Sequence, residues 1–416
     1  MTLLYLYANI QAMNILKKAY CRAFQFCFWA AFPLLPYREP EIVEDGLEGI
    51  PEVLIKEKKS HPLLLTDSGV VKAGLLDKLT SVLDRNNVEY SLFTEVVANP
   101  TTDSVEKALS LYLEENCGSL IALGGGSSMD TAKAVGARIA NPKKPLSKMG
   151  GILRVRHRIP TLLAIPTTAG TGSETTLASV IVDSETRHKY AINDFPLIPR
   201  YAVLDAEMTR TLPPHLTAST GMDALVHAIE AYIGKSNHRM TKIEAKIAVR
   251  LILSNIEKAY DDGNDMKARS AMLRASYLAG CSFTRSYVGY VHAIAHTVGG
   301  EYNIPHGYAN AVILPLVLEA YRPHIDKKLW KLAVAANLAD ELTPVKVGAD
   351  AFMARIRELK EKFSIPDTIK EIRNEDMERL AKYADKEANP LYPVPVLMDA
   401  KELEVFYNVL RGQDNE

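Results

Sequence analysis

Three short segments in the second half of the chain carry side chains that could bind a metal ion. Asp223 and His227 are four residues apart, and so are His292 and His296, so an α-helix would place each pair on one face. A further histidine, His306, stands between a proline and a glycine. Most neighbours of these residues are apolar, and a carboxylate buried among them would be costly without a cation. Imidazole nitrogens and a carboxylate oxygen are ligands that suit Fe²⁺ or Zn²⁺.

These segments offer five candidates for a site that we expect to have four ligands. Spacing alone does not choose between His292 and His296, so one of the five would lie beside the metal or act in catalysis. The alternative is structural, because a single buried histidine is more often a hydrogen-bonded core residue than a ligand. Several ligand types at helical spacing favour the metal site over that alternative.

Two loops in the first half of the chain could bind phosphate groups. The turn Gly124-Gly125-Gly126-Ser127 follows an apolar run and precedes a helical pattern, so backbone N–H groups and a helix dipole would face an anion. Residues 166–174, rich in threonine and glycine, follow the next apolar run and add hydroxyl donors. Neither loop matches the usual nucleotide-binding fingerprints, and each could be a plain strand-to-helix connection or a helix cap. Together, at neighbouring strand ends, they indicate one bound dinucleotide.

Asp67 ends the first clear strand pattern, where a carboxylate can accept hydrogen bonds from ribose hydroxyls. The same negative charge would repel a 2′-phosphate, so the sequence favours NAD, with NADP as the alternative cofactor. The surrounding sequence, Thr66-Asp67-Ser68-Gly69, is also typical of turns, so Asp67 could simply cap a helix.

The elements that would position these groups change in character along the chain. From about residue 51 to 206, short aliphatic runs alternate with amphipathic segments, which is typical of parallel strands joined by helices. After about residue 209, long segments with helical periodicity follow. We therefore predict an α/β N-terminal dinucleotide-binding domain with a parallel, Rossmann-like sheet, followed by an all-α C-terminal metal-binding domain. The expected boundaries are residues 1–36 for an apolar helical extension, 37–208 for the α/β domain and 209–416 for the helical metal and substrate domain.

Three local features are predicted as well. A single helix is expected over residues 71–86, and Asp103 is expected to cap the helix that follows. Residues 385–395 are rich in proline and charge, so they are expected to form a surface loop.

The composition excludes some classes of partner. The chain has 416 residues, 47% of them hydrophobic, which is enough for two domains with sizeable cores. Its 49 lysines and arginines nearly balance its 50 aspartates and glutamates, so the net charge does not favour nucleic acid or an anionic membrane as a partner. The four cysteines are scattered, without a C-x-x-C pair, which favours a reducing cytoplasm.

The N-terminal segment needs a separate interpretation. Residues 19–36 are nearly uncharged and follow Lys17 and Lys18, as in an export signal. However, Arg22 and Gln25 interrupt the apolar run, no convincing cleavage site follows, and a bilayer span needs ~20 apolar residues. We expect no membrane span here, and instead an amphipathic helix that packs on the body of the protein or on a second subunit.

In their order, these motifs resemble those of the iron-containing alcohol dehydrogenases. The likeness runs from about residue 40 to the C-terminus and includes the glycine turn, residues 166–174, residues 221–230 and the three histidine positions that follow. It implies that the metal is bound by Asp223, His227, His292 and His306, and that the catalytic residue near the nicotinamide is His296. It also implies dinucleotide contacts from Asp67, Asn99, Gly125, Gly126, Ser127, Asp130, Thr167, Thr168, Thr171, Thr176 and Lys189.

The resemblance further implies a metal-dependent alcohol dehydrogenase or aldehyde reductase, which transfers a hydride between NAD(H) and a small primary alcohol or aldehyde. The expected metal is Fe²⁺, with Zn²⁺ as the alternative, and the expected form is a cytoplasmic homodimer. One alternative is a glycerol-dehydrogenase-like polyol oxidoreductase. Another is a non-catalytic scaffold that assembles through the N-terminal helix, although the intact ligand set disfavours it. Phe283 and Tyr287 are candidates for the substrate pocket.

Overall fold

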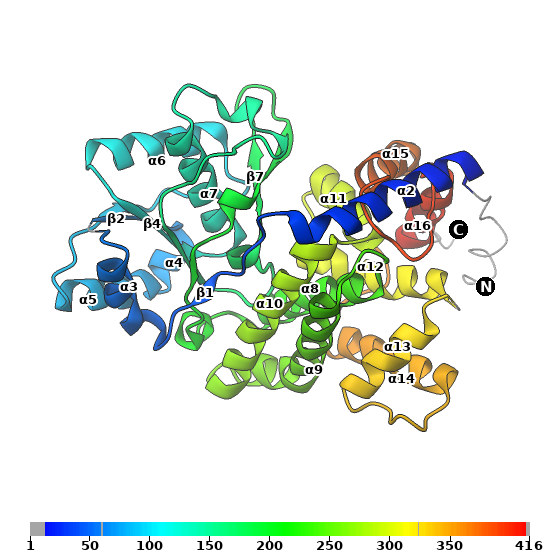
Figure 1. Cartoon of the computed structure of the whole chain (residues 1–416). Coiled ribbons are helices and arrows are strands. Elements are labelled where there is room, and N and C mark those ends of the chain that lie inside the picture. Colours follow the sequence, from blue (N-terminus) through cyan, green and yellow to red (C-terminus); the bar gives the residue numbers. More distant parts are fainter. Residues whose placement is uncertain (1–12, 60, 323, 413–416) are drawn as a thin grey trace. The chain divides into compact units, whose positions relative to one another are not determined.

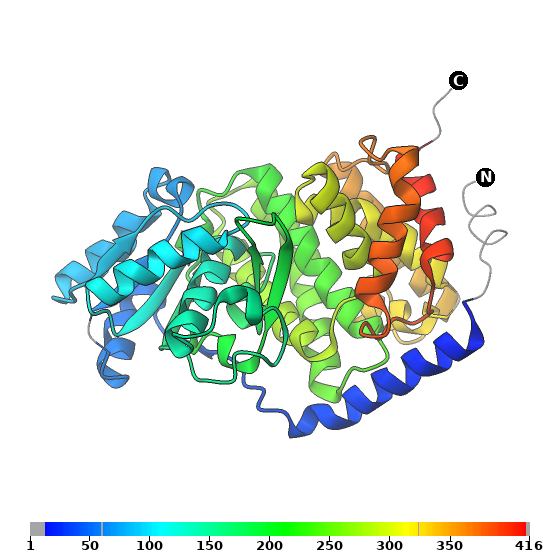
Figure 2. The same ribbon diagram turned by 90° about the horizontal axis from the view of Figure 1, so that it is seen from above.

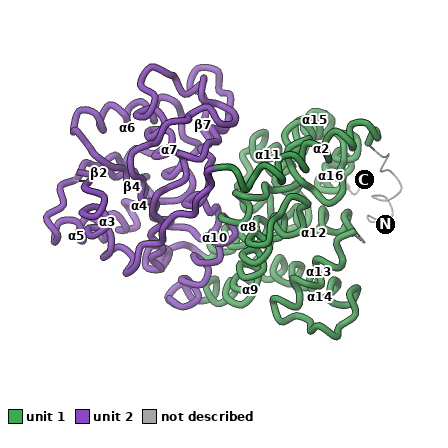
Figure 3. Tube along the Cα trace, viewed as in Figure 1, with its two compact units in different colours: residues 1–35, 214–261, 281–416 green, residues 36–213, 262–280 purple. Residues whose placement is uncertain are grey.

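The computed structural model describes residues 13–59, 61–322 and 324–412. The chain divides into two compact units, drawn in green and purple in Figure 3. Unit 1 comprises residues 1–35, 214–261 and 281–416, and unit 2 comprises residues 36–213 and 262–280.

The units differ from the expected domain limits at both ends of unit 2 and in one internal segment: residues 1–35 belong to unit 1, and unit 2 extends to residue 213. Residues 262–280 belong to unit 2, although they lie beyond the expected boundary at residue 208. A contact within unit 2 explains this, because the Tyr277 hydroxyl donates a hydrogen bond to the Pro40 carbonyl at 2.7 Å. The three expected domain ranges therefore stay a prediction.

A six-stranded parallel sheet forms the centre of unit 2 (Figure 1). In spatial order its strands are β1 (Glu41–Ile42), β9 (Tyr201–Ala202), β6 (Leu162–Pro166), β4 (Ser119–Gly124), β2 (Pro62–Leu65) and β3 (Ser91–Phe93). Every residue of β2, β4 and β6 is buried, as their continuous aliphatic runs predict for strands covered on both faces. Because Gly124 pairs with Pro166, the carboxyl ends of β4 and β6 lie side by side.

Helices cover both faces of this sheet. The helices of unit 2 are α3 (Ile50–Lys56), α4 (Ser68–Lys72), α5 (Leu75–Arg85), α6 (Thr102–Glu114), α7 (Gly126–Ala140) and the first part of α10 (Met266–Ser286). On one face, α6 and α7 pack in a core with Leu63, Leu65 and Leu120. On the other face, α3 and α5 pack against the alternate residues of the same strands, such as Leu64 and Ile121. The prediction of a parallel α/β sheet is confirmed.

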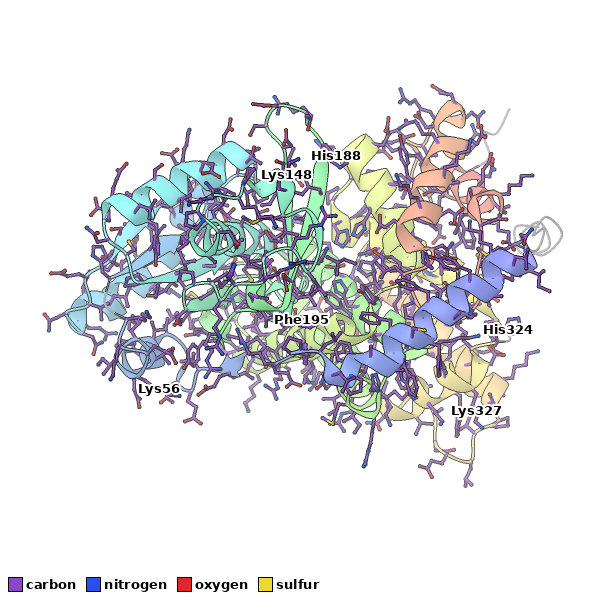
Figure 4. The ribbon with its side chains drawn as sticks, turned by 45° about the horizontal axis from the view of Figure 1, so that its top comes forward. Lys56, Lys148, His188, Phe195, His324 and Lys327 are labelled. Atoms are coloured by element: carbon purple, nitrogen blue, oxygen red, sulfur yellow. The ribbon has the colours of Figure 1, made fainter. Side chains whose placement is uncertain are left out.

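A smaller sheet completes unit 2. It consists of β5 (Gly151–Ile152), β8 (Lys189–Asn193) and β7 (Ala178–Val182), in that order. β7 and β8 are antiparallel, and His188 lies exposed just before β8, whereas Phe195 after β8 is buried (Figure 4). This hairpin carries Lys189, one of the expected dinucleotide contacts.

Two local predictions for unit 2 are wrong. The helix expected over residues 71–86 is divided into α4 and α5, because Gly74 between them adopts a positive φ of 70°. The cap of α6 is Thr101, whose side chain accepts a hydrogen bond from the Ser104 N–H, and Asp103 lies in the first turn instead. A threonine hydroxyl can cap a helix as a carboxylate does, so two neighbouring residues compete for this position.

Unit 1 is built from helices. In chain order they are α2 (Ile15–Ala31), α8 (Pro214–Ile233), α9 (Arg239–Asp261), the end of α10, α11 (Tyr290–Tyr302), α12 (His306–Tyr321), α13 (Asp326–Ala335), α14 (Val345–Lys362), α15 (Met377–Ala388) and α16 (Ala400–Arg411). α8 is buried over most of its length, because apolar residues occupy all its sides. α12 packs against α8 and α11. The prediction of a helical second half is confirmed.

The helix α2 runs along one side of unit 1, where it contacts the segment between α15 and α16 (Figure 2). The sequence predicts a surface loop over residues 385–395, and this prediction is wrong in part. α15 continues to Ala388, and Tyr392 and Val394 are buried. Among the described residues, no helix combines the length and the apolar character that crossing a bilayer requires.

Candidate metal and dinucleotide sites

Four side chains of unit 1 bring metal-binding atoms close together. Asp223 and His227 lie on α8, His292 lies on α11, and His306 is the first residue of α12. Each offers a carboxylate oxygen or a ring nitrogen, and these atoms all lie within 4.8 Å of one another. Three of the residues are buried, and His306 is partly exposed. One carboxylate and three imidazoles form a donor set that suits Fe²⁺ or Zn²⁺.

Glu230, also on α8, orients the ring of His292. Its carboxylate bonds to Nδ1 of His292 at 2.6 Å and accepts hydrogen bonds from the N–H groups of Gly289 and Val291 at 2.8 and 2.9 Å. Burial raises the pKa of the Glu230 carboxyl to about 7, and these donors act against that rise. The other ring nitrogen of His292, Nε2, is buried without a hydrogen-bond partner in the described part of the chain, and it lies 3.9 Å from Oδ1 of Asp223. Such an orphaned nitrogen beside a carboxylate fits a bound cation.

The ring of His292 is kept neutral. Burial, followed by the charges of the neighbouring imidazoles, lowers its pKa well below the usual value. The ring centroids of His227 and His306 lie 4.5 and 5.4 Å from that of His292. A neutral imidazole carries the lone pair that a metal ion needs, so the electrostatics of the cluster favour metal binding over protonation.

Asn310, one helical turn after His306, links two members of the cluster. Its Nδ2 atom donates to Oδ1 of Asp223 at 2.7 Å and lies 3.1 Å from Nε2 of His306. The same His306 nitrogen lies 3.5 Å from the Asp223 oxygen. The amide therefore holds the carboxylate of Asp223 in place, which preorganises this ligand.

His296 lies beside the cluster but bonds to a different partner. Its Nδ1 atom bonds to Oε1 of Glu387 on α15 at 2.6 Å, and its ring stacks on His306 with centroids 5.1 Å apart. The His296 side chain is 43% exposed, whereas that of His292 is 2% exposed. The structure therefore separates two histidines that spacing left equal: His292 contributes to the four-residue group, and His296 stands next to it.

The two residues suggested for the substrate pocket lie in different surroundings. The ring of Phe283, near the end of α10, stacks on His227 with centroids 4.2 Å apart. It therefore forms an apolar wall directly at the cluster. Tyr287 packs instead against Phe28 and Tyr392, with centroids 5.0 and 6.2 Å from its own.

The glycine turn of unit 2 lies at the start of a long helix. Gly124 ends β4, and α7 begins at Gly126. No side chain of the described residues caps α7, so its first N–H groups can bind an anion. A Cβ on Gly125 would lie 3.7 Å from Thr168, and one on Gly126 would lie 3.6 Å from Thr171. The two glycines therefore keep clear the space between the turn and the threonine loop.

Backbone contacts join the two loops. The Thr167 N–H donates to the Gly124 carbonyl at 3.1 Å, and Ser127 lies in the first turn of α7. At the carboxyl ends of β4 and β6 the structure thus brings together Gly125, Gly126, Ser127, Thr167, Thr168 and Thr171.

Lys133, on α7, fixes the conformation of the threonine loop through hydrogen bonds. Its ammonium group is fully buried and donates to the carbonyls of Ser173 and Ala178 at 2.7 and 2.9 Å, and to the Thr176 hydroxyl at 2.8 Å. Burial lowers the pKa of Lys133 to about 8. Asp130 accepts a hydrogen bond from the Ser173 hydroxyl at 3.3 Å. Thr176 and Asp130, both expected dinucleotide contacts, therefore take part in the bonds that join α7 to the threonine loop.

The remaining expected contacts lie elsewhere in unit 2. Asp67 caps α4, and its Oδ1 atom accepts a hydrogen bond from the Gly69 N–H at 2.8 Å, as the capping alternative predicts. Its Oδ2 atom lies 3.5 Å from where a Cβ on Gly124 would stand, so Asp67 also adjoins the glycine turn. The Lys189 ammonium group donates to Oδ1 of Asn99 at 2.7 Å, which joins these two residues at the hairpin.

Two long stretches of the chain match a known family. Residues 42–206 match the family described as iron-containing alcohol dehydrogenase, and residues 217–408 match the C-terminal part of the Fe-containing alcohol dehydrogenase family. The chain belongs to the iron-containing alcohol dehydrogenases. It is therefore an oxidoreductase, and the resemblance expected from the motifs is confirmed. The helix α2 precedes both matched stretches.

Individual relatives agree with this membership. Alcohol dehydrogenase 4 of Schizosaccharomyces pombe is 36% identical over 340 residues, which cover 80% of this chain and 79% of that protein. The NAD-dependent methanol dehydrogenase of Bacillus methanolicus is 35% identical over 327 residues, 77% of this chain and 85% of that one. A crystal structure of a 1,3-propanediol oxidoreductase has a TM-score of 0.85 at 31% identity and covers 90% of this chain and 99% of that chain.

Sequence reasoning missed three polar residues of this iron-containing alcohol dehydrogenase. Glu230 could have been found, because it is a carboxylate in the same apolar helical stretch as Asp223. Asn310 stands four residues after His306, so its position on the same helix face was also readable. Glu387 gives no local indication, because its partner lies 91 residues away in the chain.

Proposed function

We propose that this enzyme transfers a hydride between NAD(H) and a small primary alcohol or aldehyde, with a divalent metal ion bound by Asp223, His227, His292 and His306. The observation that carries the proposal is the gathering of four ligand atoms within 4.8 Å in a mostly buried site. Membership of the family supports the reaction, and the NAD-dependent methanol dehydrogenase among the relatives supports the substrate class.

The side chains around the cluster would have different roles in catalysis. When bound, the cation supplies Lewis acidity that lowers the pKa of an alcohol hydroxyl, and the nicotinamide ring supplies a hydride acceptor. Glu230 fixes the ring of His292, and Asn310 fixes the carboxylate of Asp223. Phe283 would exclude water from the neighbourhood of the reacting carbon.

His296 would carry the proton. Its Nδ1 atom bonds to Glu387, which favours the tautomer with the lone pair on Nε2, and this nitrogen would take the proton from the substrate hydroxyl. An imidazole ring can both accept and donate a proton, which suits such an exchange. In the reverse direction the same nitrogen would return the proton to the product alkoxide as the carbonyl is reduced.

The glycine turn would hold the pyrophosphate of the dinucleotide. The start of α7 offers N–H groups and a positive helix end to an anion, and Gly125 and Gly126 leave room for it. Asp67 would accept hydrogen bonds from the adenosine ribose through Oδ2, while Oδ1 caps α4. Its negative charge supports NAD over NADP.

We further propose Fe²⁺ as the natural metal, on the strength of the family likeness, and keep Zn²⁺ as the alternative because a three-nitrogen, one-oxygen set accepts both ions. A cytoplasmic homodimer rests on the family likeness, and gel filtration of the purified chain tests the dimer. Glycerol with NAD⁺, offered in place of butanal with NADH in the assay below, tests the polyol alternative.

The proposal is tested by an assay with a metal measurement beside it. Protein purified without oxygen is analysed for its metals, then mixed with NADH and butanal while the absorbance of the reduced nicotinamide is followed. We expect one metal ion per chain and a loss of NADH that depends on butanal. A chain that binds metal but turns over no aldehyde or alcohol would support the scaffold alternative instead.

A further inference from the structure

The N-terminal helix α2 makes a set of specific hydrogen bonds to the segment after α15. The guanidinium group of Arg22 donates to the carbonyls of Val394 and Pro395 at 2.8 and 3.0 Å. The amide of Gln25 donates to the carbonyl of Tyr392 at 2.8 Å, and the Gln25 side chain is almost completely buried. Donors aimed at several backbone carbonyls of one short segment hold that segment in one conformation, because each unmet carbonyl would cost free energy.

Tyr392 lies in the segment that α2 contacts, and it is connected to His296 through the carboxylate of Glu387. Its hydroxyl donates to Oε1 of Glu387 at 2.7 Å, and the same oxygen bonds to Nδ1 of His296 at 2.6 Å. The Tyr392 ring is buried, and burial raises the pKa of its hydroxyl well above the usual value, so the hydroxyl keeps its proton and remains a donor. Tyr392 therefore helps to fix the same carboxylate oxygen of Glu387 that bonds to His296.

Aromatic packing links α2 to the same point. The ring of Phe28 on α2 lies 5.0 Å from that of Tyr287, which lies 6.2 Å from that of Tyr392. Tyr287 has a φ of 59°, in the left-handed region, and a bulky residue stays there only when its surroundings hold it. Phe28 supplies part of those surroundings, so both the hydrogen bonds and the packing of α2 act on Tyr392.

We propose that α2 is a positioning element for His296, acting through Tyr392 and Glu387. The inference rests on the proposed role of His296 as the proton carrier, and it assigns a function to a helix that precedes the stretches shared with the family. The physical reason is that proton transfer depends steeply on the position and tautomer of the ring, and the contacts of Glu387 control both.

The first test removes the hydrogen bonds from α2 to the segment after α15 and leaves the residues of the metal cluster, His296 and Glu387 unchanged. In the full-length, metal-loaded enzyme, the double variant Arg22→Ala with Gln25→Ala should lower kcat on the order of tenfold, through a misplaced His296. The KM for NADH and the metal content should stay within about twofold of the wild type, a margin of less than 0.5 kcal/mol. Tyr20→Ala, on an exposed part of α2, is the matched control and should leave kcat unchanged.

Combination with His296→Ala decides whether α2 acts through this histidine. If it does, adding the two α2 substitutions to His296→Ala causes no further loss of kcat, because the group they position is already missing. A second tenfold loss in that background would show that α2 stabilises the unit in general, and would overturn the inference. If His296→Ala lowers kcat but the α2 double variant does not, the inference about α2 is wrong and the proposed role of His296 stands. If His296→Ala leaves kcat unchanged, the proposed role of His296 is wrong as well.

A spectroscopic measurement gives a second readout that needs no turnover. In metal-free protein labelled with ¹⁵N-histidine, the ring of His296 should show one tautomer, with its proton on Nδ1 facing Glu387. Tyr392→Phe removes only the hydroxyl and should broaden or shift this resonance, and the α2 double variant should produce the same change. An unchanged His296 resonance in both variants would contradict the inference even if their activities fell.

Discussion

The two proposed sites of this enzyme are built by opposite means. In the metal cluster of unit 1, every ligand atom belongs to a side chain, and the four side chains come from three helices. In the proposed dinucleotide site of unit 2, backbone N–H groups and bare glycines would face the pyrophosphate, while Asp130 and Lys133 on α7 bond to the threonine loop. Residue identity should therefore decide the first site, and backbone conformation the second.

This difference predicts how each site fails. Each substitution in the metal cluster removes one of its four ligands. The charges of the metal ion and the Asp223 carboxylate are then less well compensated in a buried site. A backbone cradle keeps its N–H groups whatever side chain is changed, so a substitution acts only by filling space or altering charge. The four predictions below test that contrast, from the largest expected effect to the smallest.

His306→Ala should abolish tight metal binding and lower kcat/KM on the order of 10³-fold, because the cation contributes several kcal/mol to stabilising the transition state. Metal analysis and NADH turnover measure the two effects. His324→Ala is the matched control, because His324 is exposed on the same unit (Figure 4). A His306→Ala protein that retains one metal ion per chain would remove His306 from the ligand set.

Glu230→Gln should weaken metal binding by about 10- to 100-fold, as is usual when the partner that orients a ligating histidine is changed. The amide keeps the shape of the side chain but removes the charge opposite Nδ1 of His292. Calorimetric titration of the metal-free protein with Zn²⁺ measures the affinity. Equal affinities for the variant and the wild type would mean that Glu230 only fills space.

Gly126→Ala should raise the dissociation constant of NADH by roughly tenfold, or about 1.4 kcal/mol, because the added methyl group enters the space between the turn and Thr171. Thermal stability should not fall, since alanine is the better helix former at the start of α7. Gly300→Ala, on α11 with open space around its Cβ, is the control and should leave NADH affinity unchanged. A variant that loses stability but not affinity would mean that the glycine is needed for folding alone.

Asp67→Asn should reduce the preference for NADH over NADPH by roughly fivefold, the effect of one charge interaction of about 1 kcal/mol. The asparagine oxygen can still cap α4, so the fold should be unaffected. The ratio of kcat/KM for the two cofactors is the measurement. If that ratio stays the same, capping is the whole role of Asp67.

Much of the molecule could be predicted from local patterns. The continuous aliphatic runs of β2, β4 and β6 indicated a sheet buried on both faces, and the structure confirms it. The spacing of Asp223 and His227 placed both on one side of a helix, because the period of the α-helix is a property of the backbone alone. The motif order likewise indicated the family that the comparisons confirm.

Local patterns gave wrong answers where neighbours compete or where distant segments meet. Thr101 and Asp103 both suit a helix start, and only the structure shows that Thr101 caps α6. Residues 385–395 are polar enough to suggest a surface loop, yet Tyr392 is buried because α2, more than 350 residues earlier, packs there.

The sequence by itself determined which residues of this protein could act as ligands, because residue type and helical period are encoded within a few positions. The tertiary structure alone decided what each of them does. His292 and His296 are equivalent by spacing, but Glu230 meets the first across 62 residues and Glu387 meets the second across 91. Such pairings arise from the packing of whole helices, so no short window of sequence contains them.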